Sequence, residues 1–115
     1  MTENLILFHR YKPKQPAKLG AGRFVLNTCM RSIVVMPSYG DATDLEGYDC
    51  YPGAQAVTFL LETVCGLKSP LIGETEVYGQ FKQAIDEQSQ QMDHAAKQLV
   101  DMVNRQAKEV RTKYL

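Results

Sequence analysis

The stretch AQAVTFLLETVCG, residues 54–66, decides the fold because the spacing of apolar residues changes there. Ala56, Val57, Leu60, Leu61 and Val64 recur at helical spacing. The glycine that ends the stretch is a natural stop for a helix. We therefore predict a helix here, which divides the chain into a strand-rich first half and a helical second half.

Short apolar runs precede this helix. The run at residues 5–8 is apolar enough for a strand that is buried on both faces. Prolines and glycines are concentrated between the runs, as is typical of loops. The sequence predicts strands at 4–9, 23–29, 32–36 and 48–51, and loops at 11–22 and 37–47.

Helical spacing continues after the decisive stretch. Residues 74–88 predict a second helix, and Asp93 is a suitable cap for a third helix that runs to residue 115. That third helix carries an apolar stripe that includes Leu99, Val103 and Ala107, with basic residues on its other face. Strands followed by helices predict a single α+β domain, with the helices laid on one face of an antiparallel sheet.

Composition narrows the functional class. The 13 basic and 13 acidic residues cancel, which argues against a general nucleic-acid binder. The three cysteines and two histidines show neither paired spacing nor metal-ligand spacing. No apolar run reaches the length of a signal-peptide core or a membrane span. We therefore expect a cytoplasmic protein that binds no metal and makes no membrane contact.

Two runs carry more information than the apolar periodicity that many proteins share. They are VLNTCMR at 25–31 and GLKSPLIGETEVYGQFKQA at 66–84. Both resemble the N-terminal catalytic domain of the glutamyl-tRNA reductase family. The run KEVRT at 108–112 is similar to the start of that family's long spinal helix. The resemblance implies one domain over 1–115: a reduced ferredoxin-like two-layer sandwich over 1–92, followed by the start of a spinal-type helix over 93–115.

The resemblance also implies a chemistry. In that family a cysteine attacks the ester between glutamate and its tRNA, and hydride from NADPH releases glutamate-1-semialdehyde from the resulting thioester. Carried over by position, Cys29 is the nucleophile, and a cation two residues on would favour its thiolate. Thr28, Arg31 and Ser69 hold the glutamyl group, with Arg31 as a fork for its carboxylate. The other substrate-binding positions are Glu74 and Gln80.

The chain lacks several features of the family pattern, including two that catalysis requires. The family's histidine near the nucleophile is replaced by Phe59, which cannot carry a proton. Residues 11–22 leave no room for the family's first helix. The chain also lacks a Gly-x-Gly-x-x-Gly unit after a strand. We therefore expect that it binds no cofactor itself, and that NADP is available only through a partner chain.

Several partners follow from these features. Without its first covering helix, part of one sheet face would be bare, and a second copy is the simplest cover, so we expect a homodimer. Glutamyl-tRNA and a full-length reductase or dehydrogenase chain are the further partners that the resemblance suggests. Arg105, Lys108 and Arg111 on the last helix would contact tRNA, although such a basic face is usually just solvated.

Three functional hypotheses remain open. The first is a stand-alone relative of the catalytic domain that binds a glutamyl group, hydrolyses its thioester, or forms a Cys29 thioester as part of a split reductase. The second is a non-catalytic module of tetrapyrrole metabolism that works by protein interaction. The third is an inactive remnant. The missing histidine and cofactor domain place binding or regulation ahead of catalysis.

The site residues also have structural alternatives. Cys29 in an apolar run is otherwise a buried core cysteine, the commoner fate of free cysteines. Arg31 is otherwise a solvated charge at a strand end. We interpret Cys50 and Cys65 as structural.

Overall fold

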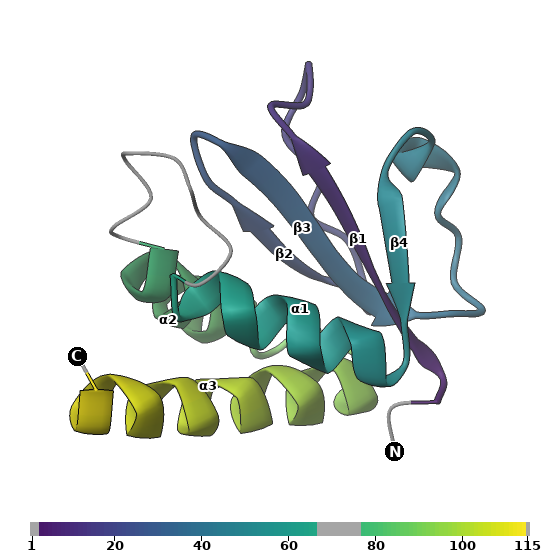
Figure 1. Ribbon diagram of the computed structural model, residues 1–115. Helices are drawn as coiled ribbons and strands as arrows, with labels where there is room; N and C mark the ends of the chain where they lie inside the picture. The colour runs from purple at the N-terminus through teal and green to yellow at the C-terminus, as the bar shows by residue number, and fades with distance from the viewer. Residues whose placement is uncertain (1–2, 67–76, 115) are drawn as a thin grey trace.

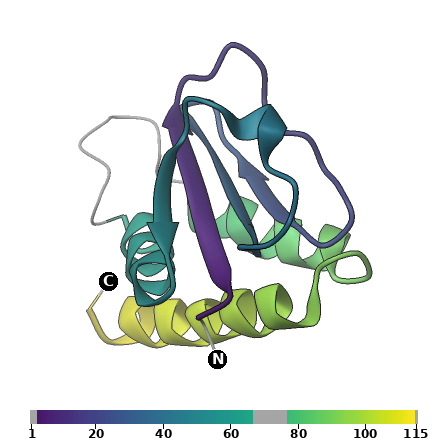
Figure 2. The same ribbon diagram turned by 90° about the vertical axis from the view of Figure 1, so that its right-hand side faces the viewer.

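The computed structural model describes residues 3–66 and 77–114, where the strands β1 (Leu5–Tyr11), β2 (Phe24–Asn27), β3 (Arg31–Pro37) and β4 (Asp49–Pro52) form one sheet. Its strand order is β2-β3-β1-β4, and the described pairings are all antiparallel. The helices α1 (Ala54–Val64), α2 (Val77–Gln88) and α3 (His94–Tyr114) cover one face of this sheet (Figures 1 and 2). The predicted α+β sandwich with a long C-terminal helix is confirmed.

Alternate side chains of the strands build the core beneath the helices. Leu5 and Leu7 of β1 and Ile33 and Val35 of β3 point to the helix side, because successive strand residues face opposite sides. They pack against the apolar stripes of the helices, including the predicted stripe on α3. The helix face also holds these buried residues: Phe24, Leu26, Ala56, Leu60, Phe81, Leu99, Val103 and Ala107.

The opposite sheet face is covered by loops. Phe8, Val25, Val34 and Met36 are buried there together with Leu45 from the second loop. Residues 12–23 and 38–48, which contain a short 3-10 turn at Thr43–Leu45, lie over this face (Figure 2). The expectation of a bare sheet face is therefore wrong, because these loops bury apolar side chains that a missing helix would have left exposed.

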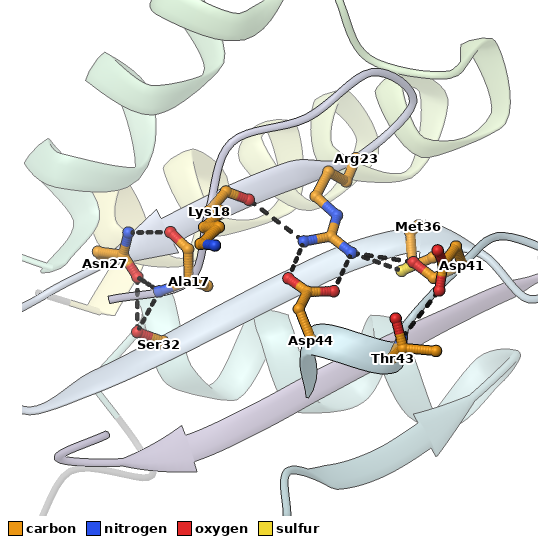
Figure 3. Close-up of polar contacts among 9 residues, drawn as sticks. All are labelled: Ala17, Lys18, Arg23, Asn27, Ser32, Met36, Asp41, Thr43 and Asp44. Carbon is orange, nitrogen blue, oxygen red and sulfur yellow. Dashed lines mark hydrogen bonds and ion pairs between the residues drawn. The ribbon is translucent and has the colours of Figure 1, made fainter. Parts of the chain in front are cut away.

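An arginine holds these two loops together. The guanidinium of Arg23, whose side chain is buried, donates to both carboxylate oxygens of Asp44 at 2.9 and 3.1 Å (Figure 3). It also donates to the carbonyl oxygens of Lys18 and Asp41 at 3.2 and 3.1 Å. The hydrogen bond from Arg23 is the main reason that the pKa of Asp44 lies below its usual value. This network lets a polar loop cover an apolar sheet face.

The outer edge of β2 is closed by a side chain from α2. The amide of Gln88 accepts from the backbone N–H of Val25 at 2.8 Å and donates to the Val25 carbonyl at 2.7 Å. Gln88 thus takes the place of a neighbouring strand, and it fixes α2 against the sheet.

Element boundaries differ from the sequence prediction at a few positions. β1 continues to Tyr11 because it pairs with β3 as far as Arg31. β2 ends at Asn27, since the chain turns there. Gly66 has a φ of 82° after α1, as expected for a helix stop, and the carboxylate of Asp93 accepts from the Ala95 N–H at 2.9 Å at the start of α3.

None of the helices in the described part of the chain is both long and apolar enough to cross a membrane.

We predict that Gln88→Leu lowers the free energy of unfolding by about 2–4 kcal/mol, because two buried backbone groups of Val25 lose their partners. Urea denaturation measures the change. Gln83→Leu makes the same chemical change at an exposed position of α2 and should cost no more than about 0.5 kcal/mol. Equal losses in the two variants would contradict the role of Gln88.

We predict that Arg23→Met destabilises the domain by about 2–4 kcal/mol at pH 7. The folded pKa of Asp44 is lowered, so this stabilisation is present above the unfolded pKa of about 3.9 and is lost as the pH falls through the folded pKa. The difference from wild type should therefore shrink in thermal melts below about pH 4. Lys113→Met, which removes an exposed pair with Glu109, is the control; a difference that does not depend on pH would argue against the pair.

Candidate functional site at the β2–β3 hairpin

Cys29 lies at the tip of the turn between β2 and β3, and it is exposed. The turn is closed by a hydrogen bond from the Thr28 N–H to the Arg31 carbonyl at 2.9 Å. The Thr28 hydroxyl oxygen accepts from the backbone N–H groups of Met30 and Arg31 at 3.2 and 3.1 Å. Cys29 is therefore not a core cysteine, and Thr28 organises the turn that presents it.

The base of this hairpin is anchored to the first loop. The side-chain oxygen of Asn27 accepts from the Ser32 hydroxyl at 2.6 Å, and its NH₂ group donates to the Ala17 carbonyl at 3.0 Å (Figure 3). The Ala17 N–H donates a hydrogen bond to the side-chain oxygen of Asn27 at 3.2 Å. Side-chain hydrogen bonds thus tie the residues on both sides of the turn to one another and to the first loop.

Arg31 follows the turn and is completely buried, with an exposed fraction of 0%. Its side chain lies on the helix side of the sheet, where Nη1 is 3.4 Å from His9 Nε2 and the guanidinium carbon is 4.8 Å from the centre of the Tyr11 ring. The alternative of a solvated strand-end charge is therefore wrong. The guanidinium lies within the fold, against His9 and Tyr11 of β1.

Phe59 of α1 stands at the position where the resemblance places a histidine. Its buried ring packs against His9, with ring centroids 4.8 Å apart, and stacks on Tyr51 at 4.4 Å. His9 and Tyr11 were missed as site residues from the sequence. The alternation of β1, which puts Leu7, His9 and Tyr11 on one face, was the signal that could have found them.

Gln80 lies on the exposed side of α2 and lines a groove of about 560 Å³. The opposite wall is β2, including Leu26 and Asn27, which lead directly into the Cys29 turn. The structure thus brings Gln80 to the same edge of the sheet as the hairpin. Ser69 and Glu74 lie outside the described residues.

The basic face of α3 is partly neutralised. Lys97 pairs with Asp101 at 3.0 Å, and Lys113 pairs with Glu109 at 3.2 Å. Arg105 and Lys108 are exposed and form no ion pair with any described residue. They line a shallow groove of about 310 Å³. The side chain of Arg111 lies outside the described part of the structure.

Other cysteines have different surroundings. Cys65 is buried at the end of α1, whereas Cys50 is exposed on β4. Cys50, which we interpreted as structural, is thus an exposed thiol outside the hairpin and serves as a reference for Cys29. No group of three or more potential metal ligands occurs among residues 3–66 and 77–114.

The described residues do not fit a nicotinamide dinucleotide. Such cofactors bind at the carboxyl ends of parallel strands joined through helices, with a glycine-rich turn at the phosphates. Here the described strand pairings are antiparallel, and the connections from β1 to β2 and from β3 to β4 contain no α-helix.

Comparison with known proteins places these features in a family. Residues 12–114 match the family described as "Glutamyl-tRNAGlu reductase, N-terminal domain". The chain is 33% identical over 93 residues to the glutamyl-tRNA reductase of Actinobacillus succinogenes, which covers 58% of this chain and 21% of that protein. It is 31% identical over 81 residues to the Methanocorpusculum labreanum enzyme, which covers 63% of this chain and 19% of that protein.

A solved structure shares the fold. The glutamyl-tRNA reductase from Methanopyrus kandleri superimposes with a TM-score of 0.76 at 21% identity, over 96% of this chain and 35% of that one. The chain spans about a fifth of the length of the curated relatives that it matches. The match over residues 12–114 shows that the chain belongs to the family of glutamyl-tRNA reductase N-terminal domains.

Proposed function

We propose that this domain binds the glutamyl group of an ester such as glutamyl-tRNA at the β2–β3 hairpin, in tetrapyrrole biosynthesis. The observation that supports it is the exposed Cys29 on a turn that Thr28 locks, at the position of the family's nucleophile. Full-length relatives are named glutamyl-tRNA reductases, which supports the choice of ligand.

Electrostatics favour an anionic ligand at this hairpin. The guanidinium of Arg31 is buried on the helix side of the sheet, where its charge is screened less than a surface charge would be. The carboxylate of a glutamyl side chain would be attracted by this field. Because Arg31 is not exposed in the described structure, its contribution is a positive potential near the turn rather than a direct fork.

Acyl transfer to Cys29 is a second candidate, which the exposure of the thiol favours. The Cys29 sulfur would form a bond to the glutamyl carbonyl carbon while the ester C–O bond breaks, and the thiol proton would go to the departing ribose hydroxyl. Phe59 offers no proton acceptor where the resemblance places a histidine. Binding is therefore proposed ahead of catalysis.

We also propose three partners: a second copy of the chain, a separate reductase or dehydrogenase chain, and glutamyl-tRNA. A homodimer, or docking to a separate reductase or dehydrogenase chain, would use a surface other than the second sheet face, since loops already bury its apolar side chains. For glutamyl-tRNA, the unpaired cations Arg105 and Lys108 are the proposed contacts to phosphate.

We predict that the domain binds glutamyl-tRNA more tightly than uncharged tRNA, because the hairpin recognises the glutamyl group. A filter-binding assay with labelled tRNA measures both affinities. Labelled glutamate that stays with the acid-precipitated protein after ribonuclease digestion, and that neutral hydroxylamine releases, measures any thioester. Cys29→Ala should abolish thioester formation, whereas Cys50→Ala, at the other exposed thiol, should leave it unchanged. Equal affinities for charged and uncharged tRNA would refute the binding proposal.

We predict that Arg105→Gln combined with Lys108→Gln weakens tRNA binding. The slope of log K against the logarithm of the salt concentration should become less steep by roughly 1.5–2. The matched control is Lys97→Gln with Lys113→Gln, which removes the same charge from cations that are already paired. Fluorescence anisotropy at several salt concentrations measures both slopes. Equal changes in the two double variants would argue against a specific contact.

A further inference from the structure

His9 is a buried histidine on the central strand β1, with an exposed fraction of 2%. In the register of β1 and β3, His9 lies opposite Ile33, and Tyr11 lies opposite Arg31. Residues two apart on a strand share a face, so His9, Tyr11, Ile33 and Arg31 form a square of neighbours on the helix side. The imidazole therefore lies diagonally across from Arg31.

The contact between these side chains favours one tautomer of the neutral imidazole. His9 Nε2 is 3.4 Å from Arg31 Nη1. A guanidinium has N–H donors and no acceptor, so Nε2 must offer its lone pair. The proton of a neutral imidazole is then on Nδ1. A doubly protonated ring would instead place a second cation against the guanidinium.

Aromatic rings hold the imidazole in this orientation. The Tyr11 ring meets His9 edge to face with centroids 4.5 Å apart, and the Phe59 ring packs against it at 4.8 Å. Phe59 is in turn stacked on Tyr51. Phe59 thus packs against one side of His9. The face of the Tyr11 ring is a second contact for the Arg31 guanidinium.

We propose that His9 is a positioning residue: as a neutral Nδ1–H imidazole it holds the Arg31 guanidinium behind the Cys29 turn. Arg31 is two residues from Cys29, so their Cα atoms are at most about 7 Å apart. A guanidinium held in one place keeps a positive potential at the thiol and at any anion bound there. The proposal deepens the proposed function and rests on it only for the identity of the bound group.

The test measures the potential at Cys29 without needing a ligand. Iodoacetate and iodoacetamide alkylate thiols similarly, but only iodoacetate is an anion. The rate with iodoacetate divided by the rate with iodoacetamide therefore rises with the positive potential at the thiol. The ratio at Cys29 should exceed that at Cys50, the exposed reference thiol on β4. Peptide mass spectrometry at fixed pH and low salt measures both sites in one sample.

Two variants separate positioning from packing. His9→Phe fills the space but lacks the ring nitrogen that contacts Arg31, so the ratio at Cys29 should fall by about twofold or more. His9→Gln keeps an acceptor oxygen near the position of Nε2 and should retain most of the wild-type ratio. The ratio at Cys50 should stay constant in both variants. An unchanged ratio at Cys29 in folded His9→Phe would overturn the proposal.

A measurement on the unmodified protein covers the case in which His9→Phe does not fold. Nitrogen-15 NMR of the histidine rings should show a neutral Nδ1–H tautomer for His9 at pH 7. A proton on Nε2 would overturn the proposal. Failure of the glutamyl-tRNA binding assay, with these two results as expected, would refute the proposed function and leave the role of His9 standing.

Discussion

The pairing of β1 with β3 is the constraint on which the rest of the structure depends. It runs over seven residue pairs, from Leu5 opposite Pro37 to Tyr11 opposite Arg31. Each strand carries apolar side chains on both faces, so the pair belongs to two cores at once. A slip of one residue would exchange the two sets of side chains and would also separate His9 from Arg31.

The two faces of this sheet are covered by different physical means. The helix side is sealed by apolar stripes, whose burial is the main source of stability. The loop side has fewer apolar residues and depends on hydrogen bonds of Arg23 and Asn27 to tie polar segments down. The chain thereby dispenses with a covering helix on that face, which the resemblance alone did not anticipate.

The hairpin site combines parts that the sequence showed with parts that it did not. A cysteine, a threonine and an arginine in the order of a known motif were visible in the chain, and the structure gives Thr28 a definite role in the turn. The burial of Arg31 and its contacts with His9 and Tyr11 were not predictable, because they depend on the register between strands that are about twenty residues apart in the chain. Exposure of Cys29 depends likewise on β2 ending at Asn27.

By itself the sequence determined the class of fold, the positions of its elements and the family, because hydrophobic periodicity and motif order are local properties of the chain. It also determined that the position of the family histidine holds Phe59. Only the tertiary structure decided that loops cover the second sheet face, that Cys29 is presented on a turn and that a histidine from β1 meets Arg31. These outcomes depend on which distant residues become neighbours, and strand register and side-chain packing set that in the folded chain.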